Sequence, residues 1–136
     1  MGTSAEVVAA CEANWEAHKS DCSGFAKAVA TVLGVSLSGM ANNIVDQIQE
    51  APWTTTMDGA VAAQQATDGM FVIGGLKEEG HGHVVVITPG PLNRGKYPTA
   101  YWGRLGSVGM ENTTINWAWN SVDRDKVIYG FTSFGQ

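Results

Sequence analysis

The stretch DCSGFAKAVATVLGV, residues 21–35, predicts a helix that begins at a cysteine. Asp21 or Ser20 can cap the first turn with a side-chain oxygen, and Gly34 stands where a helix commonly ends. At about 100° per residue, a helix over residues 22–33 places its apolar side chains on one arc. That arc comprises Cys22, Phe25, Ala26, Val29, Val32 and Leu33. The thiol is therefore expected at the N-terminal end of a buried stripe.

The position of Cys22 allows two interpretations. Free N–H groups and the positive end of the helix dipole favour an anion there, which lowers the pKa of a thiol. The same N–H groups can hold an oxyanion during acyl transfer, and Gly24 leaves room for a substrate. Alternatively, Cys22 fills space in the core, as free cysteines often do. A nucleophile also needs a base, so the stretch by itself does not decide between the two.

The candidate base lies in GHGHVVVI, residues 80–87. On a strand, His81 and His83 share one face with Val85 and Ile87, while Val84 and Val86 share the other. If the helix stripe packs on the face of Val85 and Ile87, the thiol and an imidazole reach the same edge of the core. We therefore predict a thiolate–imidazolium pair between Cys22 and His83.

Two alternatives stay open for these histidines. His81 and His83 could bind zinc together with a thiol or carboxylate, although no fourth ligand stands at a recognisable spacing. His83 could also be a hydrogen-bonded core residue, with His81 in a loop.

The rest of the chain predicts a single α+β domain over residues 1–136. Helical periodicity comes first, and β-branched or alternating runs follow. The other expected helices cover 4–17, 39–50 and 58–67, and the expected strands cover 69–76, 83–90, 99–103, 115–120 and 126–134. Helices followed by strands indicate helices packed on an antiparallel sheet.

Composition excludes several classes of function. Charged residues make up 15% of the 136 residues, the net charge is −5, and the eight basic residues form no stripe for nucleic acid. No apolar run is long enough to span or insert into a membrane. Glu6 and Glu12 interrupt the apolar start, so we expect no secretory signal. We therefore expect the protein to be made in the cytoplasm. With two cysteines there is no disulfide framework; Cys11 is expected in the core, and both thiols are expected to be free.

DCSGF, the later GHV and the loop GPLNRGKYP together resemble the first family of type VI secretion amidase effectors. These are small NlpC-like cysteine endopeptidases with a papain-like fold. AACEANW, MFVIGGLK and WNSVDRDKVIYG are also similar to that family, so the resemblance covers most of the chain.

The resemblance implies cleavage of the γ-D-glutamyl–meso-diaminopimelate amide in peptidoglycan, with Cys22 as nucleophile and His83 as general base. It implies no metal or cofactor, loading from the cytoplasm by a type VI secretion apparatus, and action in the periplasm of a recipient bacterium. A cognate periplasmic immunity protein is the expected partner, and the protein is expected to be a monomer. We expect Ser23 and Trp102 to contact the substrate.

The group that orients His83 stays unassigned. In this family it comes from the next strand, which here is TAYWG, residues 99–103. Thr99 and Tyr101 offer hydroxyls, and a backbone carbonyl could serve as well. Arg94, Lys96 and Arg104 either meet carboxylates of a wall peptide or are solvated charges.

Two other functions remain open at this stage. One is an NlpC-like peptidase with a housekeeping or phage role. The other is a zinc-binding interaction module without catalytic activity.

Overall fold

The computed structural model describes residues 2–135, and within them four α-helices pack on a six-stranded antiparallel sheet. The helices are α1 (Ser4–His18), α2 (Cys22–Leu33), α3 (Ala41–Gln47) and α4 (Gly59–Thr67). The strands are β1 (Thr54–Thr56), β2 (Phe71–Leu76), β3 (His83–Ile87), β4 (Thr99–Trp102), β5 (Met110–Thr114) and β6 (Ile128–Thr132). Two short 3₁₀ helices, η1 (Ile115–Trp117) and η2 (Asp123–Lys126), lie between β5 and β6. The predicted α+β class is confirmed.

Helix α2 has the bounds and caps that its sequence predicts. The Asp21 side chain accepts the N–H of Gly24 at 3.0 Å, and Gly34 ends the helix in the left-handed conformation with φ of 77°. The predicted apolar arc is buried apart from Val32, which is 61% exposed. The buried stripe is therefore narrower than the sequence predicts.

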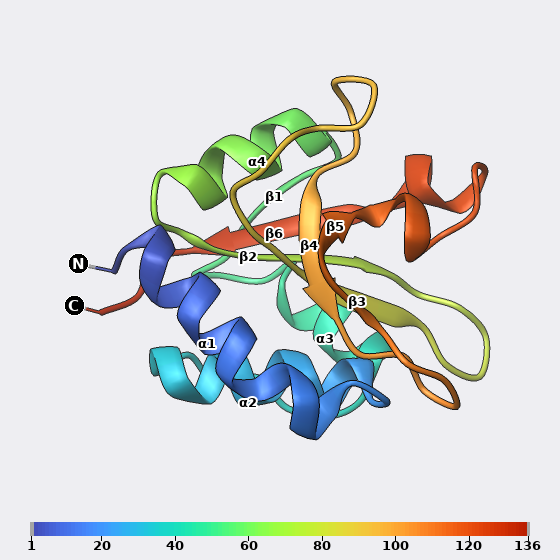
Figure 1. Ribbon diagram of the computed structural model, residues 1–136, viewed down its shortest axis with the longest axis horizontal. Coiled ribbons are helices and arrows are strands. Elements are labelled where there is room, and N and C mark those ends of the chain that lie inside the picture. The colour runs from blue at the N-terminus through green and yellow to red at the C-terminus, as the bar shows by residue number, and fades with distance from the viewer. Residues whose placement is uncertain (1, 136) are drawn as a thin grey trace.

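The sheet has helices on both faces, with α1, α2 and α3 on one side and α4 on the other (Figure 1). Its strand order is β1-β6-β2-β3-β4-β5. Helix α2 packs with Val84 and Val86, whereas Val85 and Ile87 face the core under α4. The prediction that α2 packs on Val85 and Ile87 is therefore wrong. Both faces of β3 are apolar and buried, so its alternation could not indicate which face carries the helices.

The strands differ from the prediction at three places. Four of the five expected strands are confirmed, as β2, β3, β4 and β6. Strands β1 and β5 were not predicted. The predicted strand over 115–120 is wrong, because Ala118 and Trp119 donate backbone N–H groups to the carbonyl of Ile115 and close a turn. The predicted helix over 39–50 is shorter, ending at Gln47.

The turn between α1 and α2 lies against the end of β4. Gly103 follows β4, and a Cβ atom there would overlap the carbonyl oxygen of His18. The carbonyl of Lys19 accepts the N–H groups of Arg104 at 3.0 Å and Gly109 at 2.7 Å. These contacts fix where α2 begins relative to the sheet.

The two ends of the described chain lie side by side (Figure 1). The N–H of Gly2 donates to the carbonyl of Phe134 at 2.8 Å. This bond lies near the N-terminal end of α1, away from the turn that leads into α2.

Candidate active site

Cys22 is the first residue of α2 and is 2% exposed. Burial raises the pKa of its thiol above the ordinary value, and the Asp21 carboxylate raises it further. Backbone N–H groups of Val84, Ser23 and Cys22 itself act in the opposite direction, because they hydrogen-bond to the sulfur. The expectation of a lowered thiol pKa is therefore wrong: desolvation outweighs the helix end, and the thiol is protonated at neutral pH.

Cys22 packs in the same buried core as Val84, the second residue of β3. Val84 follows His83 directly, so the structure brings the thiol to the strand end that carries the imidazole. No hydrogen bond joins the side chains of Cys22 and His83 within residues 2–135, and His83 Nε2 is buried without a partner there. The Cys22–His83 pair thus stays a prediction that requires a side-chain movement.

His83 lines a pocket of about 370 Å³ together with His81, Arg104 and Trp119. The rings of His83 and Trp119 meet edge to face, with centroids 5.2 Å apart. Burial lowers the pKa of His83 to about 3, and the charges of Arg104 and His81 add to the effect. The imidazole is therefore neutral above that pH, and the same burial makes it a weaker base in this conformation. As the thiol is also neutral, the predicted thiolate–imidazolium ion pair is not the resting state of this structure.

Neither hydroxyl proposed to orient His83 reaches it. Thr99 Oγ1 donates to the carbonyl of Pro91 at 2.8 Å. The Tyr101 hydroxyl donates to Glu12 at 3.2 Å, on the side of the sheet that carries α1. Both groups stabilise the fold, and the orienting group is neither of them.

The two expected substrate contacts, Ser23 and Trp102, are buried. Ser23 is 3% exposed, and its hydroxyl donates to Asp21 at 3.2 Å. Trp102 is fully buried, and its carbonyl accepts the indole N–H of Trp15 at 3.0 Å. The Trp102 side chain is enclosed by the core and forms no groove wall in this structure, and its backbone carbonyl joins β4 to α1.

The residues around the pocket include some that sequence reasoning missed. Trp119, Asn120 and Asp123 all line it and come from the segment after η1. The sequence did not reveal Trp119 and Asn120 because INWAWN alternates like a strand, and nothing in the spacing of Asp123 indicates contact with His83.

Cys11 is fully buried on α1, and it and Cys22 are both free thiols, as predicted. Burial raises the pKa of Cys11 well above its ordinary value. Cys11 therefore serves core packing.

Within the described residues, no three His, Cys, Asp or Glu side chains gather closely enough to hold a metal ion. The same part of the chain has no helix of the length and apolarity that crossing a membrane requires.

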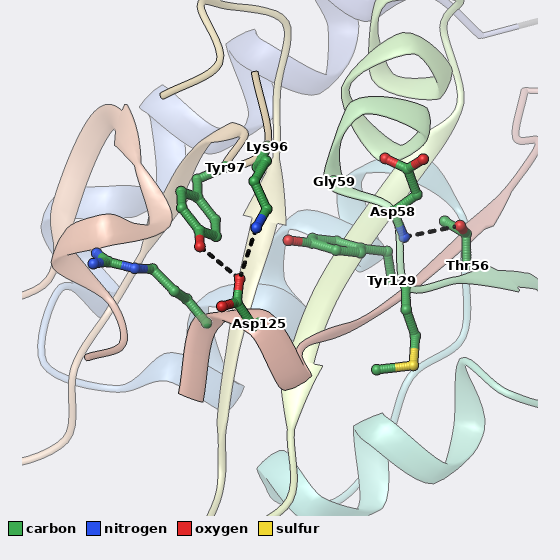
Figure 2. A pocket seen from close by; sticks show the side chains of 9 residues that line it. Thr56, Asp58, Gly59, Lys96, Tyr97, Asp125 and Tyr129 are labelled. Atoms are coloured by element: carbon green, nitrogen blue, oxygen red, sulfur yellow. Dashed lines mark hydrogen bonds and ion pairs between the residues drawn. The ribbon is translucent and has the colours of Figure 1, made fainter. Parts of the chain in front are cut away.

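A larger pocket of about 690 Å³ lies at the N-terminal end of α4 (Figure 2). Asp125 there accepts the hydroxyl of Tyr97 at 2.5 Å and lies 3.6 Å from the Lys96 ammonium. Tyr129 lines the same pocket. No histidine contributes to its lining, so it lacks the candidate base, whereas Cys22 lines neither this pocket nor the one beside His83.

Helices packed on an antiparallel sheet, with a cysteine opening one helix beside the start of a histidine-bearing strand, define a papain-like, NlpC-type fold. A scan against protein-family models finds no match. The peptidoglycan amidase Tse1 of Pseudomonas aeruginosa is 40% identical to this chain over 134 residues, which cover 90% of this chain and 86% of that protein. The chain belongs to the family of that amidase, and the predicted membership of the type VI secretion amidase effectors is confirmed.

Proposed function

We propose that the protein is a peptidoglycan amidase that cuts the γ-D-glutamyl–meso-diaminopimelate amide of stem peptides. Cys22 is the nucleophile and His83 the general base. The observation that supports the proposal is that Cys22 opens α2 and packs in the same core as Val84, the residue that follows His83 on β3. Membership of the amidase family supports the substrate class.

The chemistry follows from two neutral partners. His83 takes the thiol proton as the sulfur attacks the amide carbonyl carbon, and the resulting imidazolium gives its proton to the leaving amine. The N–H groups at the start of α2 stabilise the negative oxygen of the tetrahedral intermediate. Water, activated by His83, then hydrolyses the thioester and releases the new carboxylate. No metal or cofactor takes part.

The mechanism requires the two side chains to come within hydrogen-bond reach when substrate binds. Catalytic hydrogen bonds are often long before substrate is present and tighten in the complex.

The biological role that we propose is that of an interbacterial toxin. The protein is loaded from the cytoplasm by a type VI secretion apparatus and acts as a monomer on the wall in the recipient periplasm. A cognate immunity protein protects the periplasm of the producer.

The decisive experiment is incubation with purified peptidoglycan fragments and identification of the products by mass. We expect cleavage that is lost in Cys22→Ala, retained in Cys11→Ala and unaffected by a chelator. Cys11→Ala is the matched control because it removes the other thiol without touching the site. Cleavage by Cys22→Ala, or its loss on chelation, would overturn the proposed mechanism.

A further inference from the structure

Arg104 lies in the same pocket as His83, and hydrogen bonds from one nitrogen of its guanidinium fix its side chain. It follows Gly103 at the end of β4, is half-buried, and lines the same pocket as His83. Its Nη2 donates to the carbonyl oxygens of Trp117 at 3.2 Å and Ala118 at 2.9 Å. The side chain is therefore fixed against η1, and its position in the pocket is set before any ligand binds.

The charge of Arg104 has no carboxylate partner in the described part of the chain. The ion pairs among residues 2–135 are made by lysines at positions 19, 77 and 96. The Nε and Nη1 atoms of Arg104 donate to no protein acceptor there. Glu78 and Asp123 line the same pocket, yet neither pairs with the guanidinium. Charged groups that are buried are usually paired, so this half-buried cation still has capacity for an anion.

A second donor lines the pocket without a partner. The indole nitrogen of Trp119 is buried and unbonded within the described residues, and the residue is 6% exposed. The pocket thus joins a fixed cation, an unsatisfied N–H donor and the candidate base. This combination suits a ligand that carries an anionic group close to the bond to be cut.

We propose that Arg104 binds a carboxylate of the acidic stem peptide and thereby positions the scissile amide beside His83. This inference rests on the proposed amidase function. Guanidinium groups bind carboxylates in a two-pronged geometry that fixes orientation as well as charge. In a half-buried pocket, water screens that attraction less than at the surface.

Binding of a carboxylate also changes the base. The positive charge of Arg104 is one of the causes that lower the pKa of His83, after burial. A bound carboxylate offsets that charge, so His83 becomes a stronger base when the acidic substrate is present. His81 also lowers the pKa of His83, and Glu78 and Asp123 are the carboxylates that line the same pocket.

The test compares two synthetic stem peptides that differ only at the free carboxylate of the glutamyl residue, one as the acid and one as the carboxamide. We expect wild-type kcat/KM to be about 10- to 100-fold higher for the acid, the range of a charge-assisted hydrogen bond. In Arg104→Gln, whose amide can still donate to the carbonyls of Trp117 and Ala118, this ratio should fall close to one. The change should appear in kcat as well as in KM, because the bound carboxylate also positions the amide and strengthens His83 as a base.

Arg94→Gln is the matched control, since Arg94 is exposed and lies outside the pocket. It should keep the wild-type ratio. Unfolding temperatures of all variants show whether each is folded. If Arg104→Gln does not fold, Arg104→Lys can replace it. Lysine keeps the positive charge but lacks the two-pronged geometry of the guanidinium, so the acid-to-carboxamide ratio of kcat/KM should be intermediate.

Equal hydrolysis of the acid and the carboxamide by the wild type overturns the role of Arg104. An equal fall in kcat/KM for both peptides in Arg104→Gln also overturns it, because that result would mean that Arg104 only stabilises the position of η1. Failure of the wild type to cleave either peptide instead refutes the amidase proposal itself. The two failures are thus distinguishable.

Discussion

Asp21 caps helix α2 and at the same time raises the pKa of Cys22, the residue that follows it. Its carboxylate accepts the N–H of Gly24 at 3.0 Å and the hydroxyl of Ser23 at 3.2 Å. The same negative charge adds to burial in disfavouring the thiolate. The residue that best stabilises the start of the helix therefore also keeps the thiol protonated.

Replacing Asp21 with Asn should separate these two effects. Asparagine is as good an N-cap as aspartate, so the free energy of unfolding should change by less than about 0.5 kcal/mol. The pKa of Cys22 should fall because a negative charge beside it is removed. Alkylation of Cys22 by iodoacetamide at neutral pH should then be severalfold faster than in the wild type, provided Cys11 has been replaced by Ala in both. Equal alkylation rates would show that burial alone controls the thiol.

His83 should make stability depend on pH. Its folded pKa of about 3 lies below the ordinary value of 6.5, so the unfolded chain binds a proton that the folded protein does not. Stability is therefore complete above pH 6.5 and falls as pH decreases toward 3, by at most about 1.4 kcal/mol per pH unit. Urea denaturation at pH 7, 5.5 and 4.5 measures this slope.

His83→Gln is the matching variant, because it removes the titrating group and keeps a polar side chain of similar length. It should have a shallower slope between pH 6.5 and 4.5 than the wild type. Parallel curves for the two proteins would contradict the depressed pKa.

Gly103→Ala should destabilise the protein and loosen the site together. A Cβ atom there would overlap the carbonyl of His18 and stand 2.7 Å from that of Asp21, and backbone cannot move aside cheaply. We expect a loss of about 1–3 kcal/mol in the free energy of unfolding, as for other overpacked positions. The thiol of Cys22 should also become more accessible to alkylation, since the turn that leads into α2 is displaced.

Gly95→Asn is the control for this substitution. Gly95 has φ of 67° and no heavy atom within contact of an added Cβ, and asparagine tolerates that conformation. Its effect should stay below about 1 kcal/mol. A Gly103→Ala protein as stable as this control would show that the turn has more room than the structure indicates.

Tyr97→Phe should raise the pKa of Asp125 toward its ordinary value. The hydrogen bond from the Tyr97 hydroxyl is the main cause that lowers this pKa, and Lys96 adds less. An NMR titration of the carboxyl group measures the change, and Lys96→Gln should raise the pKa less. A larger effect from the lysine would mean that its charge dominates in solution.

The helix that carries the thiol could be predicted almost completely from the sequence. Asp21 and Gly34 mark its ends, and both act as caps in the structure. Caps and periodicity are local properties, so they survive whatever the rest of the chain does. The predicted pairing of Cys22 with His83 came from the helical arc and the strand alternation, and the resemblance to the amidase effectors supplied their expected catalytic roles.

What the sequence could not predict depends on contacts between distant segments. The sequence VVVI is apolar on both faces, so the helices could have covered either one, and the predicted packing was wrong. Strand β5 is polar and largely exposed, and β1 is three threonines at a sheet edge, so neither has an apolar signal. The predicted direction of the Cys22 pKa shift was wrong for the same reason. The burial of the thiol depends on how α1, β3 and β4 pack around Cys22.

The hydrogen bond between Gly2 and Phe134 has a practical consequence for handling the protein. Helix α1 has 15 residues and is about 22 Å long, and Cys22 follows its far end. A tag, tether or fused domain attached at either end of the chain would thus leave from the same side and stand one helix length from the thiol. Surface immobilisation through either end should leave the edge that carries Cys22 facing the solution.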